Sequence, residues 1–284
     1  MTATDKVLKQ LTKDKIIRTV HIDTSIQIER CKAKKKAQVV EEGLKNFRFK
    51  STSSYAKLEF KRAWLQRLYY VYSASQNVSR TDEVIGYIND RLGSHPMHQR
   101  RLTTCFQAIE SFLSRINGDL SPTAQLIRLR NHIRNAVLGA YAWWEFSITH
   151  EYNGTGCMRA AEQPKQLAGE RIDVSIPICK PNNIECKIHE FYEKNKNYFS
   201  DIRVAIENLG DNASKELKET KRIIDEAENN SKYLCDSRNC PKLGDSLIAV
   251  DGLSMDCFAA NNDKEWRLLS NVLGKKLVNP VRDA

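Results

Sequence analysis

The sequence lacks any hydrophobic run long enough to cross a membrane. Its longest apolar run, residues 136–144, is far shorter than the roughly 20 residues that a membrane-spanning helix needs. Residues 1–20 carry polar and charged side chains throughout, so they do not have the apolar stretch of a secretory signal. We therefore expect a cytoplasmic protein with no membrane partner.

Three sequence features of familiar sites and folds are also absent. No serine or cysteine lies in a recognisable nucleophile turn, no internal repeat is visible, and no two cysteines have CxxC spacing. The first absence argues against a hydrolase triad.

The eight cysteines are expected to be reduced in the cytoplasm, as thiols or metal ligands. Cys186 and His189 are three residues apart, on one face of a predicted helix, which suits a zinc site. Buried free thiols are the alternative. The candidate zinc ligands are Cys179, Cys186, His189, Cys235 and Cys240.

Positive charge is concentrated in the first half of the chain. The formal net charge is +10; residues 1–150 contain 25 Lys and Arg against 13 Asp and Glu, and residues 151–284 contain 20 against 22. A basic surface usually indicates a polyanionic partner such as nucleic acid, although solvated lysine-rich helices are the alternative. The candidate nucleic-acid contacts are Lys61, Arg62, Arg67, Arg128, Arg130 and Arg134. Nearby aromatics that could stack bases, or belong to the core, are Tyr69, Tyr70, Tyr72, Trp143 and Trp144.

The hydrophobic pattern predicts strands separated by helices. With 284 residues and 41% hydrophobic residues, the chain can form a packed core. A β-branched run that includes Ile16, Ile17, Val20 and Ile22 predicts a buried strand that ends at Asp23. A helix is predicted over residues 53–72, capped by Ser53 or Ser54, with Glu59 beside its apolar stripe.

The rest of the pattern predicts a helical block and then further strands. Residues 77–148 have helical periodicity throughout, residues 151–156 read as a loop, and residues 172–178 alternate as in a half-buried strand. Towards the end, we expect a helix over 246–250, a strand over 256–260, a helix over 266–273 and a strand in 275–280. This alternation implies a mainly parallel sheet.

Four acidic residues lie at strand ends or on helices near them. They are Asp23, Glu59, Asp245 and Asp263. If parallel strands bring these ends together, the four carboxylates share one pocket, where mutual repulsion favours a bound cation. Oxygen ligands favour Mg²⁺ or Mn²⁺, which can activate water for phosphodiester hydrolysis. The alternative is that Asp245 caps a helix, and that Asn262 and Glu265 form a capping box with Asp263 in the first turn.

Four segments resemble the motif blocks of the PIN domain, a metal-dependent nuclease family. In order, they are VHIDTS, SSYAKLEF, LGDSLIA and CFAANNDKEW, within residues 15–62 and 186–280. The resemblance implies a three-layer α/β/α sandwich and Mg²⁺- or Mn²⁺-dependent RNA cleavage. It also implies that Asp23, Glu59, Asp245 and Asp263 are the catalytic, metal-binding acids.

The resemblance predicts a discontinuous PIN-like core over residues 15–62 and 176–284, with an all-helical insertion over residues 63–175. The predicted function is that of a metal-dependent endoribonuclease, with single-stranded DNA as the second substrate to consider. Asn261 stands where the family often has Thr or Ser, so the alternative is a catalytically inactive PIN-like module that binds nucleic acid or protein and that zinc could stabilise. A homodimer and an inhibitor or partner protein stay open.

Overall fold

Five strands from distant parts of the chain form one central parallel sheet. The computed structural model describes residues 19–32, 34–92, 96–113, 120–157, 159, 164–167, 171–176, 179 and 185–282. The strand order is β3-β2-β1-β6-β7, and every neighbouring pair is parallel. The strands are β1 (Thr19–Ile22), β2 (Phe49–Ser53), β3 (His150–Tyr152), β6 (Cys257–Ala259) and β7 (Lys276–Val278). The predicted α/β class with a mainly parallel sheet is confirmed.

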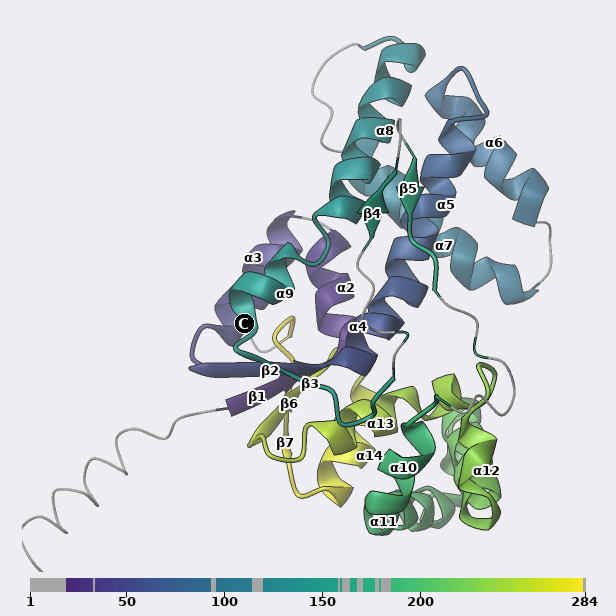
Figure 1. Cartoon of the computed structure of the whole chain (residues 1–284). Coiled ribbons are helices and arrows are strands. Elements are labelled where there is room, and N and C mark those ends of the chain that lie inside the picture. Colours follow the sequence, from purple (N-terminus) through teal and green to yellow (C-terminus); the bar gives the residue numbers. More distant parts are fainter. Residues whose placement is uncertain are drawn as a thin grey trace, which may run out of the picture.

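Helices lie on both sides of this sheet (Figure 1). On one side are α2 (Thr24–Lys32), α3 (Lys34–Leu44) and α9 (Ala142–Ser147). On the other are α10 (Ile188–Lys194), α11 (Lys196–Asn208), α12 (Lys215–Asn229), α13 (Gly244–Asp251) and α14 (Asp263–Val272). Short 3₁₀ turns join the latter group: η3 (Gly210–Asn212), η4 (Ser231–Leu234) and η5 (Cys240–Leu243).

A helical block connects β2 to β3 and projects from the sheet (Figure 1). It contains α4 (Ser54–Phe60), the π-helix η1 (Lys61–Leu65), α5 (Gln66–Ser75), α6 (Thr81–Leu92), α7 (Pro96–Leu113) and α8 (Pro122–Leu138), and it ends with α9. Because β2 and β3 are neighbours in the sheet, the whole block is the crossover connection of one parallel pair. None of the described helices combines the length and apolar character needed to span a bilayer.

Local sequence signals explain several element boundaries. Val20, His21 and Ile22 are all fully buried, as expected for a strand covered on both faces. The Ser53 side chain accepts a hydrogen bond from the Ala56 backbone N–H and caps α4 as predicted. Gly274, with φ +64°, follows the end of α14.

The strand predicted over residues 172–178 is confirmed in its first two residues, but it does not belong to the central sheet. Among the described residues of this range, 172–176, the strand is β5 (Ile172–Asp173), which pairs with β4 (Lys165–Gln166) in a separate two-stranded sheet. Ile172 and Val174 are buried, so their alternation reflects burial against the core rather than a place in the sheet. Ile16, Ile17 and Ile178 lie outside the described residues.

Two sheet strands occur where no strand was predicted. Residues 151 and 152, expected in a loop, belong to β3, and β3 lies within the range expected to form the helical insertion. β2 was not predicted because three of its five residues are Ser or Thr, so it has no run of apolar residues. These hydroxyl side chains are tolerated in the sheet interior because they find partners: the Thr52 hydroxyl donates to the Ile22 carbonyl at 2.9 Å.

Candidate carboxylate metal centre

Three of the four predicted acids meet at one point. Asp23 directly follows β1, Glu59 lies on α4 and Asp245 lies in the first turn of α13. One carboxylate oxygen from each lies within 4.8 Å of the others. The strand order reverses at β1, since β2 lies on one side of it and β6 on the other. The carboxyl ends of strands at such a reversal are where open α/β sheets bind ligands.

Asp23 is held rigidly through one of its two oxygens. Its Oδ2 accepts hydrogen bonds from the backbone N–H of Ser25 at 2.9 Å and from the Ser25 hydroxyl at 2.5 Å. The same hydroxyl accepts from the backbone N–H of Asn261 at 2.9 Å. Asp23 is only 2% exposed, and its Oδ1 has no hydrogen-bond partner within the described part of the chain. This buried oxygen is therefore available to a cation.

Glu59 occupies space that a side chain at Gly244 would fill. A Cβ built at Gly244 would lie 1.7 Å from Glu59 Oε1. The backbone at Gly244, with φ −48° and ψ −59°, is ordinary helix, so it is the missing side chain and not conformational freedom that matters here. Thr24 supports the other oxygen: its hydroxyl lies 3.4 Å from Glu59 Oε2 and 3.0 Å from the Ala56 carbonyl.

The alternative role of Asp245 as a helix cap is wrong. The N-cap position of α13 is Leu243, and no side chain bonds there to the free backbone N–H groups. Asp245 lies two residues later, half-buried, and its carboxylate faces Asp23 and Glu59.

The three carboxylates disfavour one another's charge. Burial raises the pKa of Asp23, and burial together with the nearby Asp23 raises the pKa of Glu59 to about 8. Burial, Asp23 and Glu59 raise the pKa of Asp245 well above its usual range. A divalent cation would remove this repulsion and allow all three groups to ionise.

A further acid that we did not predict as a site residue, Glu265, lies next to the triad. Glu265 is half-buried on α14, and its nearness to Asp245 contributes to the raised pKa of Asp245. Asp263 begins α14, but its side chain lies outside the described residues. The capping-box pattern pointed to Glu265; in the structure its carboxylate accepts a hydrogen bond from the Asn262 side chain.

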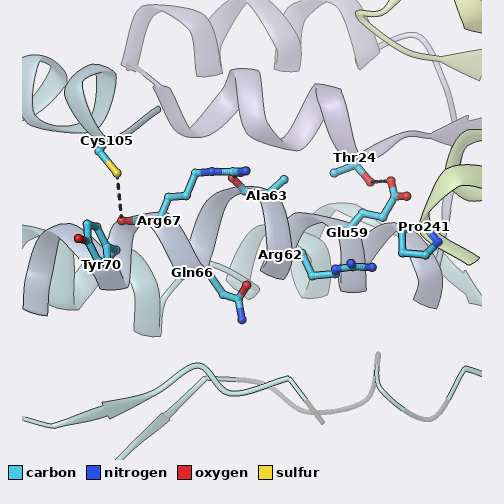
Figure 2. Close-up of a pocket in the computed structure, with 9 residues that line it drawn as sticks. All are labelled: Thr24, Glu59, Arg62, Ala63, Gln66, Arg67, Tyr70, Cys105 and Pro241. Carbon is cyan, nitrogen blue, oxygen red and sulfur yellow. Dashed lines mark hydrogen bonds between the residues drawn. The ribbon is translucent and has the colours of Figure 1, made fainter. Parts of the chain in front are cut away.

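Two grooves meet at Glu59. The first, of about 520 Å³, follows one face of α4, η1 and α5, where Arg62, Arg67 and Tyr70 line it (Figure 2). The second, of about 790 Å³, extends past Asp245 to Lys215 on α12. The π-helix η1 starts two residues after Glu59, and such wide turns are frequent at functional sites. Glu59 therefore lines both grooves, and Asp245 lines the second.

The structure brings only part of the predicted nucleic-acid surface to these grooves. Arg62 and Arg67 line the first groove, whereas Lys61 is 1% exposed and belongs to the interior. On α8, Arg128 is exposed and Arg134 is half-buried. Arg130 donates to backbone carbonyls of Ser75 and Val78, each at 3.1 Å, and so has a structural role.

Most of the predicted stacking aromatics belong to the core. Tyr72, Trp143 and Trp144 are buried, and the Arg30 guanidinium lies over the Trp143 ring. Tyr69 is half-buried, and Tyr70, also half-buried, lines the first groove. Of the five rings, Tyr70 is therefore the one that the groove presents to a ligand.

Comparisons of the chain with protein-family models, with curated proteins and with solved structures give no match. The resemblance of the four sequence blocks to the PIN domain therefore stays a prediction. A functional conclusion must depend on the geometry and chemistry of the carboxylates and their grooves.

Proposed function

We propose that this chain is a PIN-like nuclease that uses Mg²⁺ or Mn²⁺ held by Asp23, Glu59 and Asp245. The observation that carries the proposal is the convergence of three carboxylates from three separate elements, one of them with a buried oxygen that has no hydrogen-bond partner among the described residues. A purely structural cluster of this kind would be costly, because buried carboxyl groups must either stay protonated, as their raised pKa values indicate, or have a cation beside them.

The ligand set fits a hard divalent cation. Two ligands of one octahedral Mg²⁺ are about 2.9–4.2 Å apart, given metal–oxygen bonds of about 2.0–2.1 Å. Separations within 4.8 Å therefore need only small side-chain movements to close around one ion. When bound, the ion supplies a water of lowered pKa and stabilises negative charge on the scissile phosphate.

The protein groups have separate roles in this proposal. Ser25 fixes Asp23 so that its free oxygen faces the site. Glu59 is protonated in the metal-free protein near neutral pH, because its pKa is raised to about 8 by burial and by Asp23, and it gives up that proton on metal binding. Glu265, which lies close to Asp245, is an acid among the described residues that can position a metal ligand or accept a proton.

The two grooves could hold a nucleic-acid chain that extends from the site in both directions. Arg62 and Arg67 can contact phosphates, and Tyr70 can stack with an unpaired base. Grooves on both sides of Glu59 favour internal cleavage over removal of terminal nucleotides. We therefore propose single-stranded RNA as the substrate, with single-stranded DNA as the comparison.

Cleavage of end-labelled single-stranded RNA and DNA, with Mn²⁺, Mg²⁺ or EDTA, tests the proposal. We expect metal-dependent internal cleavage that Asp245→Asn reduces at least 100-fold. Asp211→Asn, at a fully exposed acid on η3, is the matched control and should cleave like wild type. Cleavage that survives EDTA or Asp245→Asn contradicts the proposal; equal RNA binding by both proteins without any cleavage indicates an inactive binding module.

A further inference from the structure

Five of the eight cysteines gather close to α10 and α13. They are Cys157, Cys179, Cys186, Cys235 and Cys240, and all five are buried. Burial raises the pKa of the Cys157 thiol, and the nearby Cys179 and Cys186 thiols raise it further. Burial likewise raises the pKa of Cys235 to about 12, with added contributions from Cys186 and Cys240. The thiols thus form one cluster built from segments far apart in the sequence.

One contact of this cluster joins a sulfur to a histidine nitrogen. Cys235 Sγ lies 3.4 Å from His189 Nδ1, in a region where α10 packs against η4. The same nitrogen donates a hydrogen bond to the Cys186 carbonyl at 2.8 Å, and zinc bound to Nδ1 would replace that hydrogen bond. Two ligands of one tetrahedral Zn²⁺, with bonds of about 2.3 Å to sulfur and about 2.0 Å to nitrogen, are about 3.5 Å apart. A hydrogen bond from the His189 backbone N–H also favours the Cys235 thiolate.

Cys157 reaches the same place through a tight turn. Gly156 has φ +55°, and a Cβ on it would lie 2.6 Å from Lys187 Cβ. The turn after β3 therefore lies directly against the residue that follows Cys186. Its position is fixed from the other side by Asp251 of α13, whose Oδ1 accepts a hydrogen bond from the Gly154 backbone N–H at 3.1 Å.

We propose that Cys157, Cys186, His189 and Cys235 bind one structural Zn²⁺. Binding would release the protons of the three thiols, and His189 would bind through a neutral ring nitrogen, so the centre would carry a net charge of −1. Among the described residues, the carboxylate triad is the group of three ligand atoms that already lie within 4.8 Å of one another, and the proposed zinc ligands are not yet that close. Zinc binding must therefore rotate the Cys157 and Cys186 side chains towards Cys235 and His189. Two thiols of the cluster are not in this proposed set: Cys179, and Cys240, which also lies beside Tyr55 of α4.

This zinc would join the two ends of the chain segment that separates β3 from α13. Cys157 lies just after β3, Cys186 and His189 lie at the start of α10, and Cys235 lies between η4 and η5. Since η5 leads directly into Gly244 and Asp245, the metal would hold the start of α13 against the rest of the core.

The zinc content of the full chain, purified without chelator, tests this assignment. We expect about one zinc per chain in wild type and at least fivefold less in Cys235→Ser. Cys31→Ser, at a half-buried thiol on α2, and Asp245→Asn should both retain the metal. Zinc-free, folded wild type overturns the proposal, and so does loss of zinc in Asp245→Asn, because the metal would then lie among the carboxylates.

A titration of metal-free wild type with Co²⁺ gives a second readout that needs no variant. Thiolate-bound tetrahedral Co²⁺ shows sulfur-to-metal charge-transfer absorption, which carboxylate ligands do not produce. We expect this absorption to saturate at about one Co²⁺ per chain and to disappear when Zn²⁺ is added. Its absence overturns the proposal. Neither readout involves cleavage, so failure of the nuclease proposal would leave this result unchanged.

Discussion

Replacement of Gly244 by alanine should displace Glu59 from the carboxylate triad. The added Cβ would lie 1.7 Å from Glu59 Oε1, and contacts under 3.0 Å essentially never occur, so this oxygen must move by at least 1.3 Å (3.0 − 1.7). Metal–ligand distances tolerate only about 0.2 Å. We therefore expect the Kd for Mn²⁺, measured by isothermal titration calorimetry, to rise by about 10- to 100-fold.

A second glycine and a double variant separate this steric effect from others. Gly86→Ala, in α6, adds a Cβ that meets no described atom within 4 Å beyond its own helix backbone, so it should leave the Kd unchanged and raise the free energy of unfolding by up to about 1 kcal/mol. In a Glu59→Ala background, Gly244→Ala should change the Kd by less than about twofold, because the clashing carboxylate is gone. Wild-type Mn²⁺ affinity in Gly244→Ala would refute the placement of Glu59 as a ligand.

Three further outcomes follow from the site. The raised pKa of Glu59, about 8 instead of 4.5, means that the folded chain binds more protons than the unfolded chain between these values. The free energy of unfolding of the metal-free protein should therefore fall as pH rises from about 5 to about 8, by up to about 1.4 kcal/mol per pH unit for each such group, and Asp245→Asn should flatten this slope in urea titrations. Glu265→Gln should reduce the metal-dependent cleavage rate more than Asp263→Asn does; the reverse order would identify Asp263 as the fourth acid. Arg62→Ala should weaken RNA binding in fluorescence anisotropy and lower the salt slope by about one, whereas Arg80→Ala, at an arginine paired with an exposed aspartate, should do neither.

The sequence allowed prediction of those elements whose signals are local. The apolar run through Val20 and Ile22, the Ser53 cap and the glycine after α14 each act within a few residues, and all three appear where expected. β2 and β3 were not predictable in this way, because their polar residues are stabilised by partners distant in the sequence, such as Thr52 bonded to the Ile22 carbonyl.

Prediction of the site was incomplete for a similar reason. The predicted strand ends and helices gave the correct local positions of Asp23, Glu59 and Asp245. The three residues come together only because the parallel sheet brings these elements to one edge. The sequence pattern indicated Glu265 only as a capping residue, because its place beside the triad depends on how α14 lies against α13. The burial of Lys61 was also not predictable from the sequence, because Lys61 lies in the wide turn of the π-helix η1.

The connection between β2 and β3 has a thermodynamic consequence for how such a chain can vary. The entropic cost of closing a flexible connection grows with the logarithm of its length, so extension from about twenty to about a hundred residues costs only about 1.4 kcal/mol. Burial of one large apolar side chain contributes about 1.5–3 kcal/mol, and α8 alone buries Leu126, Leu129, Ile133 and Val137. The helical block can therefore change in length and surface without weakening the sheet, while the strands keep the acids in register.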